Sequence, residues 1–381
     1  MGSHCSRIGV SVRFCAASFI MALSMVLGVS SALAEDAPLL KVLGQFTAPD
    51  VPERGPTEPG PTTRNWWDPA TQPSTQPAKP GNGLAQHPML YAGEGYNTLF
   101  LVNDGKVIWT YSSGRGGEID DIWLMTNGNI LYSRMSFIEE VTPQKKVVFH
   151  FDAAKGTEIH TCQPIGLDKV LFVANGLPPK AILMDKATGK IEMEHALPAP
   201  SETDPKTVHP QFRHFRMTAA GTYLAGHLNM GKVVEYDKDF NPIWTYEIKG
   251  PWSAARLKNG NTLINSESGR VVREVNAKGE TVWEFNLRTD PATGQKSDLP
   301  DGIIMGNNQT AERLANGNTI ICASTGGTRG EERIKRTQVI EVSPDKKIVW
   351  ALQDWKNLGP ATTVQILDES GIPERPGDLQ R

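Results

Sequence analysis

The stretch GPWSAARLKNGNTLINSES, residues 250–268, contains the phrase KNGNTLI, and the chain repeats this phrase as ANGNTII at residues 315–321. An Asn-Gly pair between two short runs of apolar and β-branched residues is a strong sequence sign of a β-hairpin. Related turns join strand pairs in five segments, WLMTNGNILY, PIGLDKVLFV, RMTAAGTYLA, RLKNGNTLIN and RLANGNTIIC. The repetition therefore indicates a β unit that occurs several times along the chain.

Each unit continues with a second pair of strands. Runs that end in an aromatic residue or Met recur after a tight turn, as KVIWTY, KVVFHF, KIEMEH, PIWTYE, TVWEFN and KIVWAL. The strand before each turn ends at a residue that favours turns, for example Asn103 or Asn276. Four strands in every roughly forty to fifty residues are typical of a β-propeller blade.

The number of blades follows from counting the units. Five units are complete, and a sixth has MLYAG, TLFLV and KVIWTY but no first strand of its own. The segment GPATTVQILDE, residues 359–369, can supply that strand and so pair the two ends of the chain, which removes an exposed sheet edge. We predict an all-β, six-bladed propeller of four-stranded antiparallel blades, with five or seven blades as the alternatives.

The blade pattern resembles a known family. NGNTLI followed by VxEVxxxGxxVW is similar to the repeats of quinoprotein-like and arylsulfotransferase-like bacterial β-propellers over about residues 84–368. This resemblance implies a channel histidine as a candidate sulfuryl acceptor. It also raises a quinone cofactor, which we do not expect, because the quinoprotein dehydrogenases have a vicinal cysteine pair that residues 35–381 lack.

The N-terminal region predicts export. Two arginines precede the apolar run FCAASFIMALSMVLGV, and Ala32 and Ala34 fit the small-residue positions before a cleavage point. We expect a signal peptide at residues 1–34 and therefore a periplasmic or secreted product. A Pro-rich extended linker containing Trp66 and Trp67 is expected at residues 35–83. The propeller is expected at residues 84–370 and a C-terminal tail at residues 371–381. Cys162 and Cys322 lie in apolar runs and are expected to be buried rather than disulfide-bonded.

Composition limits the partners. The chain of 381 residues has a formal net charge of −3, which gives no broad attraction for nucleic acid or an anionic membrane. We expect no nucleic acid partner, no transmembrane segment in the mature chain and a monomer. The expected partner is a small molecule, a glycan or an envelope protein.

The long loops place the predicted site. Three long segments, at residues 197–212, 286–309 and 324–336, connect strands on one face of the ring, whereas the other face has tight turns. Binding sites form on loops that a rigid scaffold positions. Aligning the inner strands gives candidate ligand-binding residues at this channel mouth and further along the same strands: Asp121, Arg213, Arg216, Trp252, Arg256, Gln309 and Arg313.

Two histidines are the candidate catalytic residues. His160 and His214 are able to act as an acid/base pair or as a nucleophile with its helper. We expect no metal, because Asp121, His160 and His214 belong to different blades and show no short ligand spacing. For the arginines, an anion site and ion pairs that tie adjacent blades both remain open, whereas the glutamates that recur once per blade favour a structural role: Glu140, Glu235, Glu274 and Glu341.

These observations predict an exported propeller that binds a ligand or a partner protein at the long-loop mouth of its channel. The ligand can be small or polymeric, and an anionic group is one option because of the arginines. The alternative is a group-transfer or hydrolytic enzyme, similar to the arylsulfotransferases, that uses a channel histidine.

Overall fold

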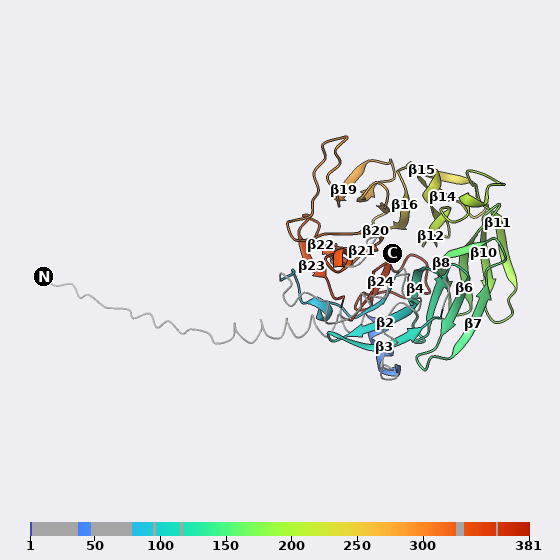
Figure 1. The fold of residues 1–381 in the computed structure, drawn as a ribbon, viewed down its shortest axis with the longest axis horizontal. Helices are drawn as coiled ribbons and strands as arrows, with labels where there is room; N and C mark the ends of the chain where they lie inside the picture. The colour runs from blue at the N-terminus through green and yellow to red at the C-terminus, as the bar shows by residue number, and fades with distance from the viewer. Residues whose placement is uncertain (2–36, 47–77, 94–96, 115–116, 325–330, 356) are drawn as a thin grey trace.

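The computed structural model describes residues 1, 37–46, 78–93, 97–114, 117–324, 331–355 and 357–381. Six four-stranded sheets stand around a central axis as a ring (Figure 1). This confirms the predicted six-bladed β-propeller. The predicted signal peptide and the pair Trp66 and Trp67 lie outside the described residues. Among the residues that are described, none of the helices has the length and apolar character needed to cross a membrane.

Each blade contributes one strand to each of four concentric layers. The innermost strands, which line the axis, are β24 (Thr363–Ile366), β4 (Ile119–Leu124), β8 (Glu158–Ile165), β12 (Phe212–Met217), β16 (Pro251–Arg256) and β20 (Asn307–Arg313). The second strands are β1 (Met89–Ala92), β5 (Ile130–Arg134), β9 (Lys169–Asn175), β13 (Tyr223–His227), β17 (Thr262–Ser266) and β21 (Thr319–Ser324).

The two outer layers follow the same order. The third strands are β2 (Thr98–Asn103), β6 (Phe137–Val141), β10 (Lys180–Asp185), β14 (Lys232–Tyr236), β18 (Val271–Val275) and β22 (Val339–Val342). The outermost strands are β3 (Lys106–Ser112), β7 (Val147–Asp152), β11 (Ile191–Ala196), β15 (Pro242–Glu247), β19 (Thr281–Asn286) and β23 (Ile348–Leu352). Short helical segments are η1 (Pro38–Gln45), η3 (Gly83–Ala85), η4 (Pro205–Thr207), η5 (Leu228–Met230) and α2 (Glu331–Ile334).

The ring closes as the sequence predicts. β24, from the C-terminal part of the chain, pairs antiparallel with β1, and Leu90 lies opposite Gln365. The first blade is therefore built from both ends of the repeat region in the order β24-β1-β2-β3. This pairing covers the inner edge of β1, and β24 takes the innermost position that the first strand holds in the other blades.

The recurring glutamates hold the tight turns and join the blades. In the NGN turn of the β16–β19 blade, Asn261 donates to Glu274 over 2.7 Å, and Gly260 adopts a φ of 85° that glycine favours. Arg313 of the next blade forms an ion pair with the same carboxylate at 2.9 Å. Equivalent pairs between neighbouring blades are Lys186 with Glu140, Arg256 with Glu235 and His87 with Glu341.

The C-terminal segment, residues 371–381, covers the tight-turn face of the channel, and Figure 1 places the C-terminus at the centre of the ring. Glu374 accepts from the backbone nitrogen of Thr126 over 2.6 Å, and its carbonyl accepts from Gly166 over 2.9 Å. Gln380 accepts from Lys258 through its side chain and pairs with the backbone of Arg313. These partners lie in or beside turns that join first and second strands, so the segment closes this end of the channel.

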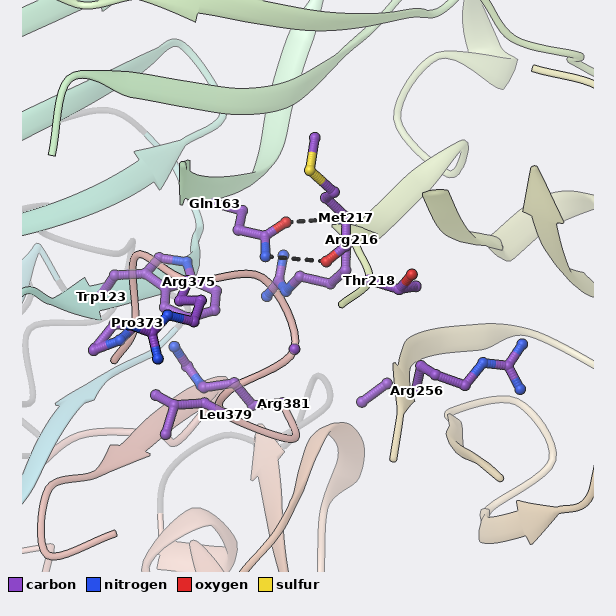
Figure 2. A pocket seen from close by; sticks show the side chains of 12 residues that line it. Trp123, Gln163, Arg216, Met217, Thr218, Arg256, Pro373, Arg375, Leu379 and Arg381 are labelled. Carbon is purple, nitrogen blue, oxygen red and sulfur yellow. Dashed lines mark hydrogen bonds between the residues drawn. The ribbon is translucent and has the colours of Figure 1, made fainter. Parts of the chain in front are cut away.

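Arg381 is the innermost part of this closure. Its guanidinium lies 4.4 Å from the ring of Trp123, donates to the carbonyl of Ile122 over 2.6 Å and reaches Thr363 over 3.2 Å. Figure 2 shows Arg381 and Leu379 opposite Trp123 and Arg216 around the small remaining space, about 20 Å³. The channel is therefore filled at its tight-turn end.

Part of the predicted linker is also ordered against the ring. η1 places Leu39, Val42 and Leu43 in the core formed by the first two blades, where Phe46 meets the ring of Trp109 edge-on at 5.3 Å. Burial of these aliphatic side chains offsets the entropy of ordering a short segment that precedes the first blade.

Candidate functional site

The inner strands carry β-bulges where they begin, at the long-loop face. The register of β4 shifts between Ile119 and Asp121, that of β12 between Phe212 and His214, and that of β16 between Pro251 and Ser253. β8 and β20 shift at equivalent places. A bulge turns side chains out of the regular alternation and recurs next to binding sites. The residues within these shifts are Asp120, His160, Thr161, Arg213, Trp252, Gln309 and Thr310.

His160 is the centre of a polar cluster at this mouth. Its Nδ1 lies 2.6 Å from Asp120 Oδ2, and its Nε2 lies 2.9 Å from Glu158 Oε2. Glu118 Oε2 is 3.5 Å from the same Nδ1. The imidazole is fully buried among these carboxylates. Because carboxylates only accept, His160 satisfies both close partners only with a hydrogen on each nitrogen.

His209, from the long loop before β12, completes the cluster from the solvent side. Its Nδ1 lies 2.8 Å from Glu158 Oε2, and its ring meets His160 edge-on with centroids 5.3 Å apart. Its side chain is 46% exposed, so water and small molecules reach the cluster here. We define the mouth cluster as Glu118, Asp120, Glu158, His160, His209 and Arg213.

Arg213 provides the fixed positive charge of the mouth cluster. Its Nη2 lies 2.9 Å from His209 Nε2, and its guanidinium stands 5.0 Å over the ring of Trp252. Longer contacts join it to Glu118 at 3.7 Å and Asp120 at 4.0 Å. Since the guanidinium can only donate, the hydrogen bond to His209 requires a lone pair on Nε2.

The electrostatics of the cluster follow from crowding of like charges. Burial, followed by the charge of Asp120, raises the pKa of the Glu118 carboxyl above its usual range. For Glu158, burial acts in the same direction, but hydrogen bonds with His160 and His209 prevail and lower its pKa. The hydrogen bond to Glu158 raises the pKa of His209.

Several buried polar atoms of the mouth have no hydrogen-bond partner among the described residues. They are Glu118 Oε2, Asp120 Oδ1, Arg213 Nε and Trp252 Nε1. Asp120 and Arg213 are each 3% exposed. An unsatisfied buried polar atom costs about 1–3 kcal/mol, and a concentration of such atoms in one place is a mark of a binding site.

The other predicted site residues lie deeper along the channel or between blades. Asp121 binds Arg216 with two hydrogen bonds, 2.8 Å and 2.9 Å long, and this pair is buried beside Trp123. Arg256 and Arg313 form the ion pairs between blades described above and stand over Trp244 and Trp283. The guanidiniums of these three arginines thus already have carboxylate partners.

His214 does not join His160. It is buried between β12 and β16, where its Nδ1 accepts from the backbone nitrogen of Ala254 over 3.4 Å. Burial, reinforced by the nearby Arg216 and Arg381, lowers its pKa well below the usual range. Among the described contacts His160 and His214 share no partner. Gln309 is buried within the bulge of β20.

Four members of the mouth cluster, Glu118, Asp120, Glu158 and His209, were not among the predicted site residues, and Asp120 stands in place of its predicted neighbour Asp121. Glu118 and Glu158 stand two residues before Asp120 and His160, in the matching phrases EID and EIH, so extending the strand alignment by two residues would have found both. His209 lies in an irregular loop and carries no repeat signal. Glu118, His160 and His209 offer ligand atoms that all lie within 4.8 Å of one another, the kind of set that can hold a metal ion.

Comparisons with known proteins support the fold. No protein-family model matches the chain, and no curated protein matches it. A solved structure of a protein of unknown function from Bacteroides caccae is similar with a TM-score of 0.62 at 22% identity, covering 73% of this chain and 98% of that one. A catalytically inactive virginiamycin B lyase from Staphylococcus aureus, solved with quinupristin, has a TM-score of 0.48 at 12% identity and covers 76% and 96%.

A third solved structure is the β-propeller domain of Cps50 (Swd1) from Myceliophteria thermophila, with a TM-score of 0.47 at 14% identity, covering 73% of this chain and 87% of that domain. At 22% identity the likeness to the Bacteroides caccae structure concerns the fold alone. The chain is a β-propeller, a scaffold that supports binding of ligands or partner proteins, and the site itself must define what is bound.

Proposed function

We propose that the protein is an exported binding propeller that takes up a small polar ligand at the long-loop mouth of its channel. The observation that carries this proposal is the concentration of unpartnered buried polar atoms at that mouth, on Glu118, Asp120, Arg213 and Trp252. The C-terminal segment closes the opposite end, which makes the mouth the accessible approach to the axis.

The chemistry of the mouth favours a ligand that donates hydrogen bonds. The cluster has three carboxylates and one guanidinium, and the three arginines deeper in the ring or between blades are paired with Asp121, Glu235 and Glu274. Amino or hydroxyl groups suit such acceptors better than a sulfate or carboxylate does. Trp252 is buried under the Arg213 guanidinium and offers a donor, its Nε1, which has no hydrogen-bond partner among the described residues. An amino sugar or a related hydroxylated amine matches both features.

The enzyme alternative rests on a different observation, the short contact between Asp120 and His160. A histidine oriented by a carboxylate is suited to acid/base work. The nucleophilic, sulfuryl-accepting role has less support, because both nitrogens of His160 face carboxylates and the cluster repels an anionic substrate. Turnover of amino-sugar glycosides or esters, lost in His160→Gln, would favour the enzyme.

The proposed export rests on the sequence of residues 1–34. Expression of the full chain in a Gram-negative host, followed by fractionation and N-terminal sequencing, tests it. We expect periplasmic protein that begins at Glu35. Full-length protein retained in the cytoplasm would contradict the proposal.

Ligand binding is tested by thermal shift with hexoses, amino sugars, polyamines and aryl sulfates. A ligand that binds the folded state stabilises it by about 2.7 kcal/mol at 100 times its Kd, so a hit raises the melting temperature measurably. Glu158→Gln should abolish the shift, whereas Glu194→Gln on the exposed strand β11 should leave it unchanged. Hits that persist in Glu158→Gln, or the absence of any hit, would contradict the proposed site.

A further inference from the structure

The mouth cluster has an excess of negative charge. Glu118, Asp120 and Glu158 carry three formal negative charges against one positive charge on Arg213 and one on the doubly protonated His160, which leaves −1, or −2 once His160 has lost the proton on Nδ1. Glu118 Oε2 and Asp120 Oδ1 are buried and accept no hydrogen bond from the described residues. A divalent cation would supply both the missing charge and the missing partner.

The two imidazoles are oriented by one carboxylate oxygen. Glu158 Oε2 lies 2.9 Å from His160 Nε2 and 2.8 Å from His209 Nδ1. The contact with Asp120 places a hydrogen on His160 Nδ1, and a metal ion that binds there displaces that proton. With both His160 Nε2 and His209 Nδ1 donating to Glu158, the opposite nitrogens, His160 Nδ1 and His209 Nε2, then carry lone pairs. A carboxylate that accepts from the outer nitrogen of a histidine is the usual second partner of a metal-binding imidazole.

Those two opposite nitrogens face the remaining carboxylates. His160 Nδ1 is 2.6 Å from Asp120 Oδ2 and 3.5 Å from Glu118 Oε2, and His209 Nε2 is 3.7 Å from Glu118 Oε1. Zinc bonds of about 2.0–2.2 Å to nitrogen and oxygen place ligand atoms roughly 3.3 Å apart around a tetrahedral ion. The distances given above, 2.6 to 3.7 Å, lie on both sides of this value, so we expect movements of the side chains to be enough to reach the tetrahedral arrangement.

We propose that the mouth cluster binds one divalent first-row transition metal ion, such as Zn²⁺, through Glu118, His160 Nδ1 and His209 Nε2, with Asp120 as the fourth ligand. Glu158 then acts as the positioning residue for both imidazoles. This inference deepens the proposed function and rests on the same cluster. Two histidines with carboxylates suit a borderline metal better than Mg²⁺ or Ca²⁺, which prefer oxygen alone.

The Arg213 guanidinium lies against the proposed ligand atoms. It contacts three of the four proposed ligands, His209 Nε2 at 2.9 Å, Glu118 at 3.7 Å and Asp120 at 4.0 Å. Its charge and the metal ion therefore exclude each other, so metal binding requires the guanidinium to withdraw. Removing Arg213 should consequently tighten metal binding, while removing a ligand should weaken it.

The test is calorimetric titration of tag-free, EDTA-treated full chain with Zn²⁺, with Co²⁺ absorption as a second readout and Mg²⁺ as the comparison ion. We expect one equivalent of Zn²⁺. His209→Ala and Glu118→Gln should lose it, and Glu158→Gln should weaken it about 10–100-fold. Arg213→Gln should bind several-fold more tightly. His195→Ala removes an exposed histidine of β11 that stacks on Phe240 and serves as the matched control.

The outcomes separate this inference from the proposed function. No Zn²⁺ bound by the wild type, or binding that His209→Ala and Glu118→Gln leave unchanged, would overturn the metal site. Because His209 is largely exposed, its replacement should fold, which the melting curve in EDTA checks. If the Zn²⁺ titration fails in one of these ways while the EDTA-treated protein still shows the ligand-dependent melting shift that Glu158→Gln abolishes, the metal inference alone has failed and the binding function stands.

Discussion

The two ends of the channel are built from the same inner strands but differ in how their charges are balanced. At the tight-turn end, Asp121 is paired with Arg216, and Arg381 lies 3.8 Å from Glu312. At the long-loop end, three carboxylates surround His160 with one guanidinium, and four buried polar atoms have no hydrogen-bond partner in the described chain. The closed end has three such atoms, on Arg216, Glu312 and Glu374, but there Arg216 and Glu312 each have a charged partner of opposite sign. Unsatisfied groups of this kind persist where function requires them. We therefore expect the closed end to contribute stability and the mouth to bind the ligand.

The largest effect on stability is expected for Arg381→Ala, at the closed end of the channel. The change removes three donors to Ile122, Thr363 and Val364 and leaves Glu312 buried without its cation. Breaking a buried pair in this way costs about 3–5 kcal/mol. We expect that loss in the free energy of unfolding from urea titration. Arg375→Ala, in the same segment but with a 64% exposed side chain, is the control and should change stability by less than about 0.5 kcal/mol. Equal effects would show that the segment does not close the channel.

The second test uses the pH dependence of Glu312. Burial raises its pKa to about 7, although Arg381 opposes this. Below about pH 4 the Glu312 carboxyl is protonated in both the folded and the unfolded chain, so it does not change the free energy of unfolding. As pH rises, the unfolded chain releases its proton first, so stability falls up to about pH 7, by about 3 kcal/mol in total. Glu312→Gln should therefore match the wild type near pH 4 and exceed it at pH 8.

Urea unfolding at pH 4–8 measures this difference, with Glu247→Gln on the exposed face of β15 as the control. A difference between Glu312→Gln and the wild type that stays constant across this range would mean that the carboxyl does not titrate in the fold.

The ring could be predicted from the sequence because every blade repeats the same local features. These are Asn-Gly turns, alternating apolar residues and a glutamate that accepts a hydrogen bond from the turn. Each signal is weak, but several copies of it agree. Closure by residues 359–369 was predictable because one blade lacked a strand. Residues 371–381 have no such periodicity, and their hydrogen bonds go to turns far away in the sequence, such as those at Thr126 and Lys258.

The mouth was predicted in position but not in composition. Strand alignment brought Asp121, His160, Arg213 and Trp252 to equivalent positions. It could not reveal the bulges, because the inner strands are buried on both faces and have no apolar alternation that an extra residue would interrupt. His209 belongs to a loop whose path depends on tertiary contacts. The pairing of Arg216 with Asp121 joins blades two positions apart, beyond what adjacent repeats show.

The smallest stability effect is expected at the mouth, with His209→Ala. The side chain is 46% exposed, and its partners Glu158 and Arg213 keep other contacts with His160 and Trp252. Water replaces the lost hydrogen bonds there, so the free energy of unfolding should change by less than about 1 kcal/mol. Urea titration in EDTA at pH 7 measures this. A loss comparable to that of Arg381→Ala would mean that the cluster is a structural network like the closed end, and the contrast between the two ends would then fail.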